Sequence, residues 1–226
     1  MRSKCNEFSN LCSGLPWAWC NLFRNPFGEL TREERAELAI VDVRELAEHV
    51  KDSRSAVQLI GECGRGKTTR MLALEQFLPA ASYVYLDEDL SCGAIPSGNP
   101  LLIDEAQRLP RDVMRTLFST GLPLILATHR DLSRSLRRFG YKVTNYPLGP
   151  SNDASLIMQA MNRRIEASRL ETPRVEPGPV PVPRLSIKDA ETLVHRFGSD
   201  VRAIESYLYE QVQKQVNSDG EMRFVD

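Results

Sequence analysis

The chain has 226 residues, of which 42% are hydrophobic and 26% charged, and its formal net charge is −1. This length is enough for one well-packed domain and a small second unit. The near-neutral charge argues against a protein coated with basic residues for nucleic acid, although it leaves room for a local basic patch. No apolar run approaches the roughly 18 residues of a membrane helix, so we expect no membrane span.

The first twenty residues carry Asn, Ser, Glu and Pro where a signal peptide has an apolar centre, so we expect a cytoplasmic protein. The five cysteines are too widely spaced for a zinc-binding pair and too few for a secreted disulfide scaffold. They are Cys5, Cys12, Cys20, Cys63 and Cys92. We interpret them as reduced thiols, with a metal site as the alternative.

Residues 1–30 form the first predicted segment, an irregular N-terminal arm that contains both tryptophans, Trp17 and Trp19. Its aromatic side chains are expected to cover the edge of the core, and a partner-binding tail is the alternative. The α/β core is predicted over residues 31–150. It starts with an amphipathic helix, because Thr31 and Glu34 form a capping box and apolar residues then recur at spacings of three and four.

Short apolar runs alternate with helical stretches through the rest of the core. The predicted strands are 56–61, 82–87, 100–105, 123–129 and 141–148. The predicted helices between them are 67–78, 111–120 and 131–139. This alternation predicts an α/β fold, a three-layer sandwich with a mostly parallel five-stranded sheet. The link over residues 91–100 is too rich in Gly and Pro for a crossover helix.

A small all-helical unit is predicted over residues 151–216, and residues 217–226 form a tail. A proline-rich connector, 172–184, follows the first helix of this unit. Ser186 is expected to cap the second helix, and a third follows it.

The stretch GECGRGKT, residues 61–68, matches the phosphate-binding pattern G-x-x-x-x-G-K-[ST] at every fixed position. Phosphate oxygens need inward-pointing backbone N–H groups, and side chains at Gly61, Gly64 and Gly66 would obstruct them. A strand leads into the loop and a helix leads out of it, which predicts a P-loop NTPase fold. A glycine-rich turn that only joins the two elements is the alternative.

The other residues of the loop have separate expected roles in holding ATP and Mg²⁺. Lys67 is predicted to contact the β- and γ-phosphates, and the Thr68 hydroxyl to ligate the metal. Thr69 is placed to reach the α-phosphate, and Arg65 belongs to the same nucleotide-binding stretch. Cys63 is interpreted as a small residue whose exposure would make ATP binding sensitive to thiol reagents.

Three polar residues that end later strands supply candidates for hydrolysis. Asp104 is predicted to hold Mg²⁺ through water, and Glu105 to act as the general base. The next strand ends at His129, which is expected beside the γ-phosphate if that strand lies between the other two. Surface acids that finish a strand, and a partly exposed loop histidine, are the alternatives.

Together these residues resemble the P-loop ATPases of the additional-strand class, and within them the AAA+ group. The segment ATHRDL looks like the sensor-1 segment of AAA+ proteins, which gives His129 the sensor role. The segment FGSDVRAI, residues 197–204, is similar to the G-x-x-R stretch of AAA+ lids, which makes Arg202 the sensor-2 arginine. The DEAQ form at 104–107 and NPFGE at 25–29 look most like the MuB, TniB and ExeA-type ATPases of DNA transposition and protein secretion.

The resemblance implies a Mg²⁺-dependent ATPase whose helical lid controls a protein partner or DNA, and it implies a homo-oligomer. One basic group has three open interpretations: a solvated helix face, trans-acting stabilisation of a neighbour's transition state, or phosphate contacts with DNA. Its members are Arg130, Arg134, Arg137, Arg138 and Lys142. None of the arginines can be assigned as an arginine finger.

Other functions are compatible with the glycine-rich loop. A regulatory switch that binds ATP with little hydrolysis is the main alternative. An ABC-type cassette would explain LILATHRDL, but no LSGGQ-like segment precedes LLIDE. A small-molecule kinase would need an acceptor site, and the sequence indicates none.

Overall fold

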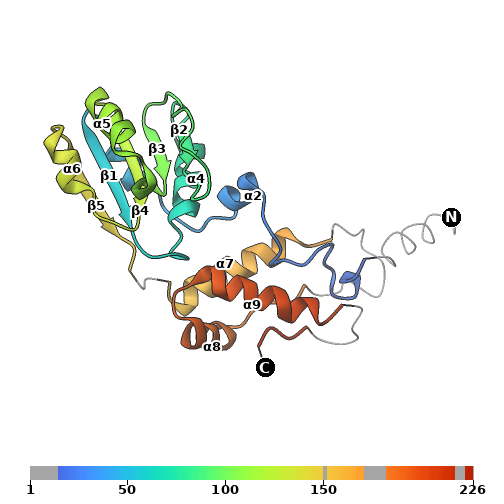
Figure 1. Ribbon diagram of the computed structural model, residues 1–226. Helices are drawn as coiled ribbons and strands as arrows, with labels where there is room; N and C mark the ends of the chain where they lie inside the picture. The colour runs from blue at the N-terminus through green and yellow to red at the C-terminus, as the bar shows by residue number, and fades with distance from the viewer. Residues whose placement is uncertain (1–14, 150–151, 171–181, 217–221, 226) are drawn as a thin grey trace, which may run out of the picture. The chain divides into compact units, whose positions relative to one another are not determined.

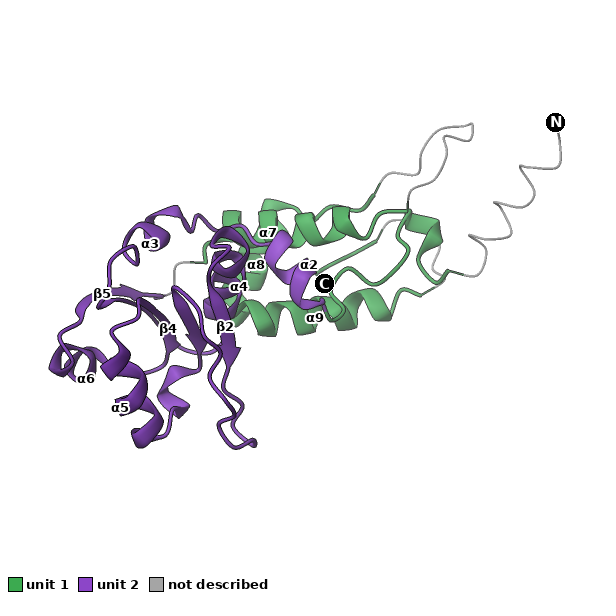
Figure 2. Ribbon diagram, turned by 90° about the horizontal axis from the view of Figure 1, so that it is seen from above, with its two compact units in different colours: residues 1–29, 152–226 green, residues 30–151 purple. Residues whose placement is uncertain are grey.

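A computed structural model describes residues 15–149, 152–170, 182–216 and 222–225. The chain divides into two compact units, residues 30–151 and residues 1–29 with 152–226 (Figure 2). The first unit is α/β and the second is helical. Cys5, Cys12, most of the proline-rich connector and most of the predicted tail lie outside the described residues.

The α/β unit is built on a parallel sheet with the strand order β2-β3-β4-β1-β5 in the described part of the chain (Figure 1). The strands are β1 (Ser55–Ile60), β2 (Ser82–Tyr85), β3 (Leu101–Asp104), β4 (Leu124–Thr128) and β5 (Lys142–Pro147). Every neighbouring pair is parallel. The predicted fold class is therefore confirmed.

Both faces of the sheet are covered, which explains why its central strands are continuous apolar runs. Successive residues of a strand point to opposite faces, so Leu102 and Ile125 join one apolar cluster while Leu101 and Leu124 join another. The first cluster contains side chains of α3 (Arg44–Glu48) and α4 (Lys67–Phe77). The second contains side chains of α5 (Arg111–Thr120) and α6 (Ser133–Arg138).

The predicted leading helix is wrong in its length, because the structure has two short helices instead. The first, α2 (Arg32–Glu37), begins with the expected capping box of Thr31 and Glu34, and the second is α3. Between them lie the β-branched residues Ile40, Val41 and Val43, which have low helix propensity. Asp42 Oδ1 accepts a hydrogen bond from the Arg44 backbone N–H (3.0 Å) and so favours a new start.

The link from β2 to β3 contains no helix over residues 86–100, as its Gly and Pro content predicts. The parallel pair β2 and β3 is therefore joined by an extended loop. Cys92 and Ile95 of this loop pack against the core, and near its end Ser82 Oγ donates to the Ser97 carbonyl oxygen (2.5 Å).

The helical unit contains α7 (Ala154–Ala167), α8 (Ile187–Phe197) and α9 (Val201–Gln213). Ser186 caps α8 in a capping box with Asp189. The described part of the N-terminal arm, with the short 3-10 helix η1 (Ala18–Cys20), packs into this unit and not against the sheet. Trp17 Nε1 donates to the Val212 carbonyl oxygen (3.2 Å), and Phe27 packs edge-on against Phe224.

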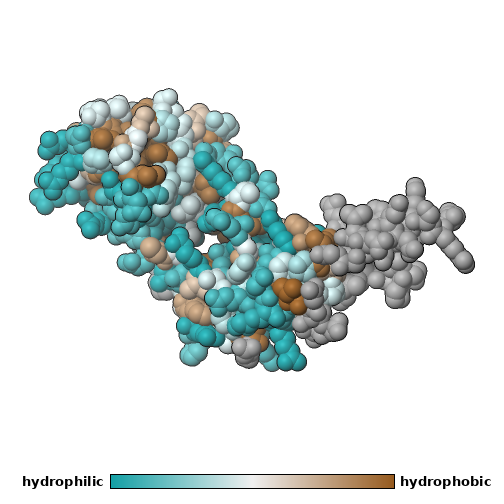
Figure 3. Space-filling view, turned by 45° about the vertical axis from the view of Figure 1, so that its right-hand side comes forward, coloured by the Kyte–Doolittle hydropathy of each residue, from teal (hydrophilic) through white to brown (hydrophobic). Residues whose placement is uncertain are grey.

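No helix among the described residues is both long and apolar enough to cross a bilayer. The face drawn in Figure 3 is mostly hydrophilic where the structure describes it, with small apolar spots between polar residues. Exposed large apolar side chains occur in both units; they are Phe23, Phe77, Tyr85, Leu90, Ile187 and Tyr209.

Candidate functional site

The strand order brings the predicted site residues of the α/β unit to one edge of the sheet. β4 lies between β1 and β3, and the three strands are parallel, so their carboxyl ends are adjacent. Gly61, Glu105 and His129 each follow one of these ends. A crevice at the carboxyl ends of parallel strands is where open α/β sheets bind ligands.

The glycine-rich loop joins β1 to α4 in a backbone conformation that favours glycine. Gly64 and Gly66 have left-handed φ angles of 73° and 76°, and Gly66 is the N-cap of α4. At Gly61 a Cβ atom would lie 2.7 Å from the Leu148 carbonyl oxygen, which is too close. The backbone N–H groups at the start of α4 are therefore left open for an anion.

Lys67 is the first residue of α4, and its side chain turns back across the loop. Its Nζ donates to the carbonyl oxygens of Gly61 (2.7 Å) and Glu62 (2.8 Å). The residue is 5% exposed, and burial lowers the pKa of its ammonium group. Lys67 forms no direct ion pair with any described residue, but the nearby carboxylates of Glu105 and Asp104 raise its pKa and partly offset the effect of burial.

Asp104 ends β3 and is completely buried. It accepts hydrogen bonds from Tyr83 Oη (3.1 Å) and from the Glu105 backbone N–H (3.0 Å), and the Thr68 hydroxyl lies near enough to lower the pKa of its carboxyl group. Burial raises the pKa of the carboxyl group, and these hydrogen bonds partly offset that effect. The structure therefore brings together the two predicted metal ligands, Thr68 and Asp104.

Glu105 and His129 face each other across the carboxyl ends of β3 and β4. His129 Nε2 lies 3.4 Å from Glu105 Oε2 and 3.4 Å from Lys67 Nζ. In its neutral form Nε2 either accepts from the ammonium group or donates to the carboxylate, depending on the tautomer. The three side chains thus form one connected polar group at the mouth of the loop.

Two further residues, Gln107 and Tyr83, contact the candidate site and were given no role in the sequence analysis. Gln107, in the 3-10 helix η2 (Ala106–Arg108), donates through Nε2 to Glu105 Oε2 (2.6 Å) and accepts through Oε1 from the His129 N–H (3.2 Å). Tyr83 lies on β2 and reaches Asp104 across the β2–β3 pair. The DEAQ form indicated Gln107 only as part of a resemblance, and no sequence signal indicated Tyr83.

The other predicted ATP-binding residues lie in or beyond the loop. Thr69 is half-buried in the first turn of α4. The Arg65 Nη1 atom is buried and has no hydrogen-bond partner among the described residues. Cys63 is exposed, and its Sγ lies 3.9 Å from His129 Nε2. Arg202 lies in the first turn of α9, in the helical unit, so its sensor role stays a prediction.

The basic group of the sequence analysis lies on α6 and on the residues next to it, and all five of its members are exposed. Exposure is common to its three interpretations, so all three stay open.

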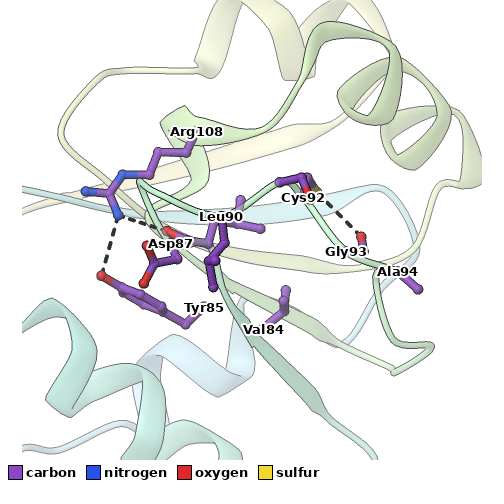
Figure 4. A pocket seen from close by; sticks show the side chains of 10 residues that line it. Val84, Tyr85, Asp87, Leu90, Cys92, Gly93, Ala94 and Arg108 are labelled. Carbon is purple, nitrogen blue, oxygen red and sulfur yellow. Dashed lines mark hydrogen bonds between the residues drawn. The ribbon is translucent and has the colours of Figure 1, made fainter.

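A pocket of about 290 Å³ lies between the end of β2 and the loop that follows it, and Arg108 lines it as well (Figure 4). Arg108 lies at one end of this pocket and donates to the Leu86 carbonyl oxygen (2.9 Å) and to Tyr85 Oη (3.4 Å). The guanidinium of Arg108 also lies 3.7 Å from Glu105 Oε2. The candidate base is therefore held from the pocket side as well.

These residues fit a triphosphate with Mg²⁺. A hydroxyl and a carboxylate already in contact are the hard oxygen ligands that Mg²⁺ takes. A buried lysine in the first turn of a helix suits phosphate oxygens. The contacts of Glu105 with Gln107, His129 and Arg108 all go to Oε2, so Oε1 is left to accept a proton from water.

Comparison with known proteins finds no matching family model and no similar curated protein. Among solved structures, the chain is similar to the ORC2 protein of Aeropyrum pernix, solved in ADPNP and ADP complexes. The identity is 14% and the TM-score 0.42, over 88% of this chain and 69% of that one. This likeness identifies no family for the chain.

Proposed function

We propose that the protein is a Mg²⁺-dependent ATPase of the AAA+ type. The observation that carries the proposal is the meeting of Lys67, the pair Thr68 and Asp104, and Glu105 at the carboxyl ends of neighbouring strands. A phosphate-binding loop alone would support only nucleotide binding. A buried carboxylate beside the loop threonine, followed directly by a second acid, adds what hydrolysis needs.

Each side chain has one task in the proposed reaction. Lys67 places positive charge against the phosphates, and Thr68 and Asp104 hold Mg²⁺, which when bound neutralises developing charge on the phosphate oxygens. Glu105 orients the attacking water and accepts its proton. His129 contacts the γ-phosphate or that water.

In this proposal the helical unit acts as a lid that responds to the nucleotide through Arg202. The sequence resemblance supports this role and makes a protein of a transposition or secretion system, or DNA, the candidate partner. Homo-oligomerisation belongs to the same proposal.

A switch that binds ATP with little hydrolysis is the second candidate, and one observation favours it. Glu105 is already engaged by Gln107, His129 and Arg108 (2.6, 3.4 and 3.7 Å). A base held by three partners gives slow turnover if they fix it away from the attacking water. Measured turnover separates the two candidates.

Lys67→Ala tests the shared premise of both candidates. The substitution removes the buried ammonium group, so ATP affinity measured by calorimetry should fall at least about tenfold, as expected when a charge-assisted phosphate contact is lost. Wild-type phosphate release with Mg²⁺, and none with EDTA, supports the ATPase. ATP affinity of Lys67→Ala equal to that of wild type would show that the loop is not a phosphate site.

A further inference from the structure

Both ends of the Gln107 amide are used in the candidate site. Nε2 donates to Glu105 Oε2 (2.6 Å), and Oε1 accepts from the His129 backbone N–H (3.2 Å). The opposite amide orientation would set a carbonyl oxygen against a carboxylate and an NH₂ group against an N–H. Only one orientation of the amide therefore satisfies both neighbours.

The partner of Oε1 is a backbone group at the end of a buried strand. All residues of β4 are buried, and the strand is paired with β1 as far as Thr128, so the His129 N–H directly follows a well-packed strand. Gln107 therefore bridges the end of β4 and the carboxylate of Glu105 through two hydrogen bonds.

The backbone of Glu105 is held on both sides, because its N–H donates to Asp104 Oδ1 (3.0 Å) and its carbonyl oxygen accepts from the Arg108 N–H (2.9 Å), but these bonds do not fix the end of its side chain. It has a left-handed conformation, with φ 59° and ψ 39°, which is uncommon for residues other than glycine. Its side chain is only 13% exposed. The carboxylate at the end of the side chain is held by Gln107, His129 and Arg108, and Gln107 makes the shortest of these contacts.

We propose that Gln107 is a positioning residue that holds the Glu105 carboxylate at a set distance from the end of β4, and so from the γ-phosphate. The proposal rests on the proposed ATPase function. Both hydrogen bonds of Gln107 go to Glu105 and His129 and neither goes to the glycine-rich loop, so Gln107 acts on the chemical step and not on nucleotide binding. A displacement of about 1 Å of a reacting group can cost about 100-fold in rate.

Two variants separate the two hydrogen bonds. Gln107→Met keeps the length and approximate volume of the side chain and removes both bonds. Gln107→Glu keeps an acceptor for the His129 N–H, but it removes the donor to Glu105 and sets two carboxylates together. Gln76→Met is the matched control, because Gln76 is exposed near the far end of α4.

The experiment measures kcat and KM for ATP, together with affinity for a non-hydrolysable ATP analogue and for Mg·ADP·fluoroaluminate, which resembles the transition state. We expect kcat to fall about 10- to 100-fold in both Gln107 variants. Affinity for fluoroaluminate should weaken by a similar factor, while affinity for the ATP analogue stays within about twofold and Gln76→Met behaves as wild type.

The outcomes distinguish this inference from the function on which it rests. A wild-type protein without turnover and without preference for fluoroaluminate overturns the ATPase and the positioning role together. Active wild type with unchanged kcat in Gln107→Met overturns the positioning role alone. An equal loss of affinity for the ATP analogue and for fluoroaluminate would mean that Gln107 supports the general structure of the site, which overturns the positioning role. A near-normal kcat in Gln107→Glu would mean that the hydrogen bond to the His129 N–H matters and that the one to Glu105 does not, which overturns the positioning of Glu105.

Discussion

At the scale of single residues, the site depends on polar groups that are buried and yet satisfied. Asp104 is the clearest case, because its carboxylate is completely buried and is stabilised by donors from three elements: Tyr83 on β2, Thr68 on α4 and the N–H of Glu105. A buried carboxylate that loses one donor is left partly unpaired, which costs more than an ordinary hydrogen bond.

Tyr83→Phe should therefore lower the free energy of unfolding by about 1–3 kcal/mol, the usual cost for a hydrogen bond to a charged group. The ring stays in place, and with it the contact of Arg32, whose guanidinium lies 4.4 Å from the ring centroid. Urea denaturation of the metal-free protein measures the difference.

Tyr85→Phe is the control, because Tyr85 lies two residues along the same strand and is 49% exposed. It should change stability by no more than about 0.5 kcal/mol. Equal effects of the two substitutions would mean that the Tyr83 hydroxyl does not stabilise Asp104.

At the scale of elements, the strand–loop–helix unit depends on close contact between β1 and β5. The first residue of the loop, Gly61, faces the Leu148 carbonyl oxygen just beyond β5, and a Cβ atom would lie 2.7 Å from it. In Gly61→Ala the backbone must shift, at a cost of about 1–3 kcal/mol for overpacking. We expect a lower melting temperature and ATP affinity weakened at least about threefold, measured by differential scanning fluorimetry and calorimetry.

Gly93→Ala provides the comparison, because nothing lies within 4 Å of the added methyl group. If the two alanine variants melt and bind ATP alike, the close approach at Gly61 does not limit the shape of the loop.

The same elements show what the sequence could predict. Continuous apolar runs bounded by Gly, Pro and acidic residues predicted the strands and the fold class, because a strand buried on both faces leaves a strong local pattern. The leading segment was predicted as a single continuous helix because the helical spacing of apolar residues continues through 40–43. The β-branched residues there interrupt the helix.

Contacts between distant residues left no such pattern. The glycine-rich loop and the pair Asp104 and Glu105 are each recognised from a short local pattern in the sequence. The order of the strands then brings them side by side. The hydrogen bonds of Tyr83 to Asp104 and of Gln107 to His129 join separate elements, so they need the register of the sheet. The packing of the N-terminal arm into the helical unit was missed for the same reason.

At the scale of the whole molecule, the α/β unit holds every predicted site residue except Arg202, which belongs to the helical unit. Any response of the helical unit to the nucleotide therefore involves both units of the chain. The same holds for assembly with other copies. The exposed arginines around α6 make assembly testable, because trans-acting arginines require a neighbouring copy.

We expect the mass of the protein in solution, measured by light scattering, to increase when a non-hydrolysable ATP analogue and Mg²⁺ are added. Lys67→Ala should keep the mass of the nucleotide-free protein under both conditions. A wild-type monomer with and without the analogue would exclude stabilisation by arginines of a neighbour.

The central claim is that Glu105 performs the hydrolytic step at a site that binds ATP independently of it. The most direct test is phosphate release by Glu105→Gln, with ATP affinity measured on the same samples. Because the base is removed and the phosphate contacts remain, we expect affinity within about threefold of wild type and turnover lowered at least about 100-fold. Glu88→Gln, an exposed acid that also pairs with Arg108, should keep wild-type turnover. Near-normal turnover in Glu105→Gln would contradict the account.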